Sequence, residues 1–125
     1  MKTIKTHHDL DVWKASMDLT IDLYRLTENF PDQEKFGLTS QLRRAGDSIC
    51  SNIAEGSARN QSKEFLQFLY ISLGSLSEIE TQLEISARLG YLSSADLEKI
   101  SPDRIRRMLA GLIIAIKSKI SSQLS

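Results

Sequence analysis

Cysteine occurs only once in this 125-residue chain, at position 50, so no disulfide can form within it and a reducing compartment suits it. Long apolar runs are also lacking, because the longest, at 112–116, is far too short to span a bilayer. The first residues lack the apolar core that a signal peptide needs. We therefore expect a cytoplasmic protein that has no membrane partner.

Proline is scarce as well, since it is found only at positions 31 and 102. The segments between these prolines and the glycines have helical rather than alternating periodicity. They predict long helices over 9–29, 38–57, 62–89 and 102–121, with a short helical start near 93 or 94. Ser101-Pro102-Asp103 is typical of a helix N-terminus, so the fourth helix should be broken or kinked near Pro102.

These elements predict an all-α fold, an antiparallel up-down four-helix bundle formed by one domain over 1–125, with residues 1–8 as a flexible arm. The apolar residues of three helices fall on single faces. In the second helix these are Leu38, Leu42, Ala45, Ile49 and Ile53. In the third they are Phe65, Phe68, Leu69, Leu73, Leu76, Ile79 and Leu83. In the fourth they are Ile105, Met108, Leu109, Leu112, Ile113, Ile116 and Ile120.

The first helix differs because it has two apolar stripes. One contains Val12, Leu19, Leu23, Leu26 and Phe30. The other contains Leu10, Trp13, Met17, Ile21 and Tyr24 and lies roughly 140° away around the helix. A bundle needs only one inward face, and Trp, Met and Tyr are enriched at interfaces. We predict that the second stripe is an oligomer interface; the alternative is a cover formed by the N-terminal arm or the following loop.

Gly74 lies inside the predicted third helix, where glycine costs about 1 kcal/mol relative to alanine. Either a neighbouring helix approaches closely at this position, or the glycine is simply tolerated there. The pattern alone does not separate the two interpretations.

Residues for catalysis or metal binding are sparse. The two histidines, His7 and His8, precede every predicted helix and form no Glu-x-x-His pair. Cys50 has no histidine near it in the sequence and borders an apolar stripe, which favours a structural thiol over a nucleophile. No glycine-rich segment has phosphate-binding spacing. We therefore expect no enzymatic activity, no cofactor and no metal.

Charge is zero in total but uneven along the chain. Residues 64–103 hold seven acids and two bases, whereas residues 104–125 hold five bases and no acid. These bases are Arg104, Arg106, Arg107, Lys117 and Lys119. One interpretation is that the last two long helices pair their charges across a shared seam, each pair contributing little. The other is a basic strip that binds RNA, DNA or an acidic protein.

Several segments in order along the chain resemble one family. They are LDVWKA at 10–15, Phe30-Pro31, GLTSQLRRA at 37–45, SICSNIAEG at 48–56, Phe68-Leu69 and Gly74-Ser75-Leu76. The chain resembles the four-helix-bundle proteins encoded in intervening sequences of bacterial 23S ribosomal RNA genes. The same family includes the accessory variability determinants of diversity-generating retroelements. The similarity covers roughly residues 9–120.

This resemblance implies an antiparallel bundle that assembles as a ring-like homopentamer. The retroelement branch binds a reverse transcriptase and nucleic acid through a strongly basic surface, and the zero net charge of this chain departs from that pattern. Within the matching segments, the polar residues Arg44, Asn52 and Glu55 are candidates for structural pairing, within or between subunits, or for a ligand site.

Together these features predict a non-enzymatic homo-oligomeric scaffold with weak, sequence-independent nucleic-acid binding. The competing predictions are a protein-only adaptor and a reverse-transcriptase accessory protein.

Overall fold

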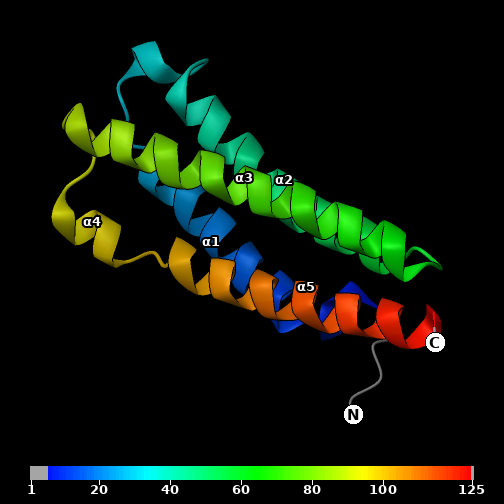
Figure 1. The fold of residues 1–125 in the computed structure, drawn as a ribbon. Coiled ribbons are helices and arrows are strands. Elements are labelled where there is room, and N and C mark those ends of the chain that lie inside the picture. Colours follow the sequence, from blue (N-terminus) through cyan, green and yellow to red (C-terminus); the bar gives the residue numbers. More distant parts are fainter. Residues whose placement is uncertain (1–5, 125) are drawn as a thin grey trace.

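The computed structural model describes residues 6–124, and within that range it contains helices and no strand. The long helices are α1 (Asp11–Thr27), α2 (Leu38–Ser57), α3 (Ser62–Arg88) and α5 (Pro102–Leu124). The short helices are α4 (Ser94–Glu98) and two 3-10 turns, η1 (His7–Asp9) and η2 (Asp32–Glu34) (Figure 1). The all-α prediction is confirmed, and each long helix lies within a few residues of its expected range.

The break near Pro102 is also confirmed, because α4 ends at Glu98 and α5 begins at Pro102 itself. The start of α4 is stabilised by a capping box. The backbone N–H of Asp96 donates to Ser93 Oγ at 3.1 Å, and the N–H of Ser93 donates to the Asp96 carboxylate at 3.0 Å. Hydrogen bonding of the Asp96 carboxylate by Ser93, through its backbone N–H first and its side chain second, holds the pKa of Asp96 below its usual value.

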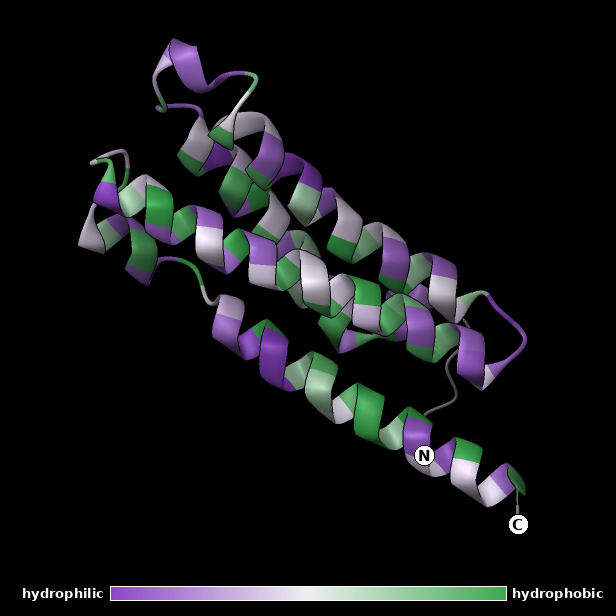
Figure 2. Ribbon diagram, turned by 45° about the horizontal axis from the view of Figure 1, so that its top comes forward, coloured by the Kyte–Doolittle hydropathy of each residue, from purple (hydrophilic) through white to green (hydrophobic). Residues whose placement is uncertain are grey.

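Cross-helix hydrogen bonds set the direction of α2 relative to α3. Gln82 donates to Gln41 at 3.2 Å, and the hydroxyls of Ser48 and Ser75 are 2.9 Å apart. Because residue numbers rise along α2 while their partners' numbers fall along α3, these two helices are antiparallel. They lie side by side in Figures 1 and 2.

The same reasoning applies to the other neighbouring pairs. Tyr24 bonds Asp47 while Thr27, further along α1, bonds Arg43 of α2. Between α3 and α5, Arg106 pairs with Glu80, whereas Lys117 lies over the ring of Tyr70. In both pairs, residue numbers rise along one helix while the numbers of their contact partners fall along the other.

The core consists of one continuous cluster to which all four long helices contribute. Its large side chains with no exposed surface are Leu23, Leu42, Ile49, Ile53, Leu69, Leu76, Ile79 and Leu109. All eight belong to stripes expected from the helical periodicity. Figure 2 shows the hydrophobic residues (green) recurring between hydrophilic ones along each helix, as amphipathic packing requires.

Two glycines of α2 allow close helix packing. A Cβ atom at Gly56 would lie 2.6 Å from Cβ of Phe68 and 2.9 Å from Cδ1 of Phe65, both on α3. A Cβ at Gly46 would lie 3.0 Å from Oγ1 of Thr20 on α1. Gly74, in contrast, is exposed, and nothing lies within 4 Å of a Cβ built there. The close approach considered for Gly74 is therefore absent in this chain and occurs instead at Gly46 and Gly56.

The N-terminal segment is described only from residue 6, so residues 1–5 of the predicted arm lie outside the described part. From residue 6 the arm is ordered as η1, with Thr6 as its N-cap. Within residues 6–124, none of the helices combines the length and the apolar composition that a membrane crossing requires.

Candidate interaction surfaces

The residues of the second apolar stripe of α1 lie in different environments. Leu10 is buried in the core and cannot reach a partner. Trp13 is half-buried beneath the arm, with the His7 and His8 rings 4.7 and 4.9 Å from its own. The N-terminal arm therefore covers Trp13, which was the alternative to an oligomer interface at this position.

The remainder of that stripe is more accessible. Ile21 is 44% exposed, and Met17 is half-buried one turn before it. Tyr24 belongs to a polar cluster, because its hydroxyl donates to the Asp47 carboxylate at 3.0 Å and the Arg43 guanidinium lies over its ring. Burial and the hydrogen bond to Asp47 raise the pKa of Tyr24. Met17 and Ile21 thus remain as the apolar part of the predicted interface.

The polar residues of the α2 segment have local partners. Asn52 donates to the Ser48 backbone carbonyl at 2.8 Å and to its hydroxyl at 3.0 Å, which satisfies the amide beside the core. Glu55 pairs with Arg59 at 3.0 Å. Glu55 therefore does not pair with Arg44 within the chain, as one of the interpretations allowed.

Arg44 lines a polar groove between α2 and α3. The groove has a volume of about 380 Å³, and its other polar lining residues are Gln41, Ser48, Ser75, Glu78 and Gln82. Gln82 Oε1 is buried there without a hydrogen-bond donor in the described part of the chain.

Cys50 is buried against α1, with its Sγ 3.4 Å from Oγ1 of Thr20. Burial raises the pKa of the Cys50 thiol, and the neighbouring Asp47 charge adds to the shift. The thiol is therefore protonated near neutral pH, as expected for a structural cysteine. Among residues 6–124, no three His, Cys, Asp or Glu side chains gather as metal ligands would.

The basic residues of α5 do not form one strip. Arg104 and Arg107 are three residues apart and share one side of the helix, whereas Arg106 points to a different side. Arg106 pairs with Glu80 of α3, and Arg107 pairs with Asp103 one turn earlier. The ion pair between Arg106 and Glu80 joins α5 to α3, as the first interpretation of the charge distribution expected.

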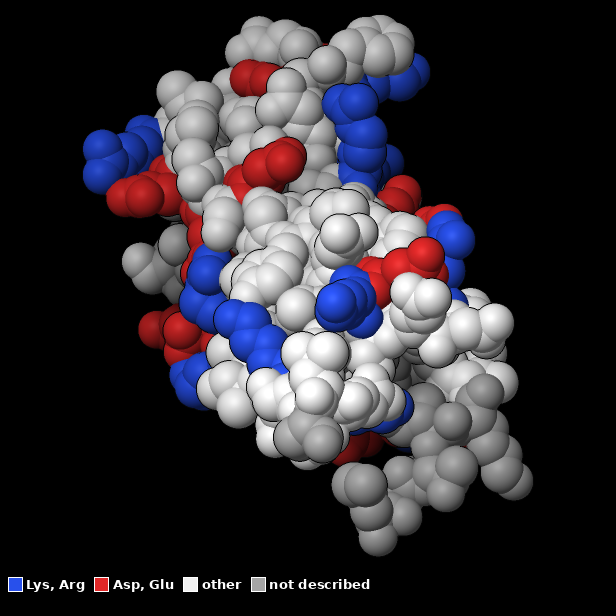
Figure 3. Space-filling view, turned by 45° about the vertical axis from the view of Figure 1, so that its right-hand side comes forward, with Lys and Arg blue, Asp and Glu red and all other residues white. Residues whose placement is uncertain are grey.

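The other cations are also separated. Lys117 lies over the Tyr70 ring at 5.5 Å from its centroid, Arg104 lines a groove with Asp18 of α1, and Lys119 lines another with Lys63. Figure 3 shows one face of the molecule, on which basic and acidic side chains lie among each other and around a large uncharged area. No single-sign patch dominates this face.

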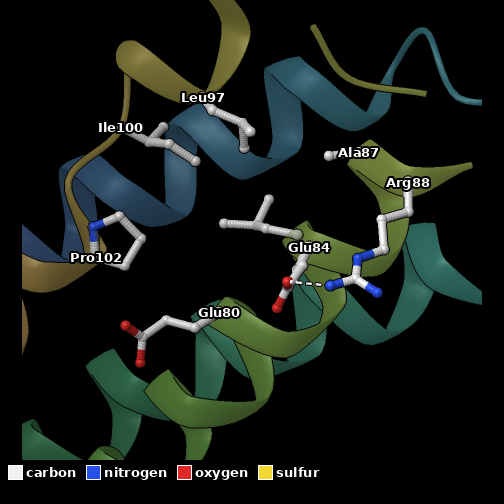
Figure 4. A pocket seen from close by; sticks show the side chains of 8 residues that line it. Glu80, Glu84, Ala87, Arg88, Leu97, Ile100 and Pro102 are labelled. Atoms are coloured by element: carbon white, nitrogen blue, oxygen red, sulfur yellow. Dashed lines mark hydrogen bonds and ion pairs between the residues drawn. The ribbon is translucent and has the colours of Figure 1, made fainter. Parts of the chain in front are cut away.

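A wide apolar pocket lies where α3 ends beside α4 and the start of α5. We call it the α3–α4 pocket; its volume is about 490 Å³. Its apolar lining residues are Leu83, Ala87, Leu97, Ile100 and Pro102. Glu80, Glu84 and Arg88 line its α3 side, opposite Leu97, Ile100 and Pro102 (Figure 4).

Eight large apolar side chains of the described residues are exposed, and four of them lie on α3 or at its C-cap. The four are Tyr70, Ile71, Ile85 and Leu89. The most exposed of the eight is Phe36, at 88%, in the loop between α1 and α2. Sequence reasoning missed Phe36 because it lies between the helices and belongs to no periodic stripe. An aromatic residue next to Lys35 and Gly37 was the only available signal.

Comparison with known proteins decides the family. The family model described as 23S rRNA-intervening sequence protein matches residues 8–111. The chain belongs to this family. The 23S rRNA-intervening sequence part of the resemblance noted in the sequence is therefore confirmed.

One solved structure is similar in fold to this chain. It is a protein with unknown function from the S23 ribosomal protein family of Bacteroides thetaiotaomicron VPI-5482, solved at 1.70 Å resolution. It is 27% identical to this chain over 82% of this chain and 94% of its own, with a TM-score of 0.74. No curated protein that was compared with the present chain matches it. The bundle of the family therefore extends over most of the chain.

Proposed function

We propose that this protein is a non-enzymatic, homo-oligomeric scaffold whose building unit is an antiparallel up-down four-helix bundle, acting in the reducing cytoplasm. The observation that carries the proposal is the apolar surface of α3 and its C-cap, which together bear four exposed large side chains. Single exposed apolar residues are ordinary on a monomer, whereas several on one helix are typical of an interaction surface.

A second apolar area supports assembly rather than a single binary contact. Met17 and Ile21 of α1 are accessible, and α1 and α3 are not neighbouring helices in the order of contacts α1–α2–α3–α5. A subunit of a ring needs two separate surfaces, one for each neighbour. Five subunits is the number that the family resemblance implies.

The test of the proposal is the mass of the protein in solution. Light scattering at micromolar concentration should give several times 14.1 kDa, and near five times if the ring is a pentamer. Met17→Asp should yield smaller species, because it would place an unpaired charge in an apolar contact. The matched control is Ser51→Asp, which adds the same charge on the exposed side of α2 and should leave the mass unchanged. A monomeric unaltered protein would refute the proposal.

Nucleic-acid binding is the second candidate activity, and one observation favours it. Within residues 6–124, Arg104 and Lys119 form no ion pair, so both remain available for phosphate contacts, which an oligomer would repeat. Because Arg106 and Arg107 already have acidic partners, we expect weak binding that is independent of sequence and falls steeply with salt.

Fluorescence anisotropy measures this binding. The probes are labelled RNA and single- and double-stranded DNA, and the titrations start at about 50 mM salt. Arg104→Glu with Arg107→Glu should weaken binding equally for all sequences and reduce the salt dependence by about one to two phosphate contacts per subunit. Lys14→Glu with Arg59→Glu makes the same charge change at two cations that already pair with Asp11 and Glu55, and should have a smaller effect. Absence of binding at tens of micromolar protein would favour the protein-only adaptor.

A reverse-transcriptase accessory role is the third candidate. It would require a strongly basic surface, whereas this chain has 16 basic and 16 acidic residues. We therefore place it behind the other two.

A further inference from the structure

The segment 93–101, which we call the α4 strap, is attached to the bundle differently from the long helices. Each long helix has several buried residues, whereas α4 itself has none. The strap is attached through Ile100, which is 7% exposed, and through half-buried Leu97. Leu92, also 7% exposed, lies just before it. Few apolar side chains therefore hold the strap in place.

The hydrogen bonds of residues 93–100 stay within the segment. Ser93 and Asp96 form the capping box, and the Leu97 N–H donates to the Ser93 carbonyl at 3.2 Å. The N–H groups of Lys99 and Ile100 donate to carbonyls three residues earlier, at 3.2 and 3.3 Å. Among residues 6–124, no hydrogen bond or ion pair joins 93–100 to another element. The strap could therefore leave the bundle without breaking its own turn.

Both ends of the strap are fixed to the bundle. Before it, the Tyr91 N–H donates to the Ser86 carbonyl at 2.9 Å, and the Tyr91 hydroxyl donates to the Glu34 carboxylate at 3.0 Å. After it, α5 begins at Pro102, and Ile105 in its first turn is buried in the core. Movement of the strap would therefore stop at Tyr91 and at Pro102.

Unfilled space surrounds the end of the strap. The α3–α4 pocket, about 490 Å³, lies on its α3 side (Figure 4), and a second hollow of about 390 Å³ lies on its α1 side, beside Leu26. Ile100 lines both hollows and so lies between them. Lys99 and Ser101 line a third, of about 140 Å³. Because empty space beside a side chain forfeits dispersion contacts, the strap is held less firmly than the packed core.

We propose that the α4 strap is a movable element that opens as a unit, hinged at Tyr91 and Pro102, while the four long helices stay folded. In the open state Ile100 leaves its place, and the hollows on its two sides join into one cleft between α1 and α3. Local units of this kind open at a lower free energy than the whole domain unfolds. The inference concerns motion within one subunit and does not depend on self-assembly.

Amide hydrogen exchange of the intact protein, followed by NMR at several urea concentrations, tests the opening. Corrected for intrinsic rates, the amides of Leu97 and Lys99 should exchange at least about 100-fold faster than those of Leu76 and Ile79 in the core of α3. Their exchange should also depend only weakly on urea, because opening the strap exposes little surface.

Two variants separate local opening from global unfolding. Ile100→Ala should speed exchange at Leu97 and Lys99 by about 10- to 100-fold, because it removes the buried anchor of the strap. The matched control is Ile53→Ala, which truncates a fully buried isoleucine one turn before Gly56, far from the strap. It should speed exchange of the core amides and leave the strap amides unchanged.

Thiol reactivity gives an independent measurement. Ile100→Cys places a thiol on the strap, and the native Cys50, buried against α1, serves as the reference within the same molecule. The introduced thiol should react with DTNB at least about 100-fold faster than Cys50. Ile79→Cys makes the same change at a fully buried position of α3, and its thiol should react as slowly as Cys50.

Three outcomes would overturn the inference. Strap and core amides could exchange at equal rates with equal urea dependence, or Ile53→Ala could speed both sets alike. The thiol introduced by Ile100→Cys could also react as slowly as Cys50, whether the strap is rigid or a neighbouring subunit covers it. None of these results bears on the proposed scaffold, which is tested by its mass in solution.

Discussion

Leu76→Ala should lower the free energy of unfolding by about 2–5 kcal/mol, because it removes a fully buried side chain and leaves a cavity that the helices only partly close. Leu76 lies in the middle of α3, the helix that packs against both α2 and α5. Urea unfolding followed by circular dichroism, at one fixed protein concentration, measures the change.

Ile114→Ala is the matched control for this prediction. Ile114 is 67% exposed on α5, so its truncation should change the free energy of unfolding by less than about 0.5 kcal/mol in the isolated subunit. If Leu76→Ala and Ile114→Ala lowered the free energy of unfolding equally, the placement of Leu76 in the core would be contradicted.

Gly56→Ala should destabilise the protein by up to about 2 kcal/mol, although alanine is the better helix former. The new Cβ would lie 2.6 Å from Cβ of Phe68, close to the α3 backbone, so α2 and α3 would have to separate. Overpacking of this kind costs about 1–3 kcal/mol, against a gain in helix propensity of about 1 kcal/mol.

Gly74→Ala makes the same chemical change where the structure leaves open space, so it should stabilise the protein by about 0.5–1 kcal/mol. Thermal unfolding of the two variants side by side tests the pair, and their melting temperatures should move in opposite directions. A loss of stability for Gly74→Ala would indicate that another copy packs against that position.

The helices themselves were predictable because their signals are local. Ser93 and Asp96 have capping spacing in the sequence and form the capping box, and Pro102 begins the last helix. The core was predictable for the same reason. At 3.6 residues per turn, each stripe predicted for α2, α3 and α5 forms one face, and the fully buried large apolar side chains of these helices lie on it.

The candidate surfaces were only partly predictable. The second stripe of α1 was recognised, but its division was not, since Leu10 turns into the core and Trp13 lies beneath the histidines of the arm. Phe36 gave no periodic signal. Its exposure comes from the loop geometry, in which Glu34 bonds Tyr91 and Leu38.

By itself, the sequence determined the helices to within a few residues and most of the core, because hydrogen bonding within a helix and the burial of one face depend on neighbours a few positions apart. Only the tertiary structure decided which glycines admit a neighbouring helix, which cations of α5 meet an acid, and where a pocket forms. The α3–α4 pocket is made by residues from positions 80 to 102 on three elements. Such a surface exists only once those elements are packed, so no local pattern could have specified it.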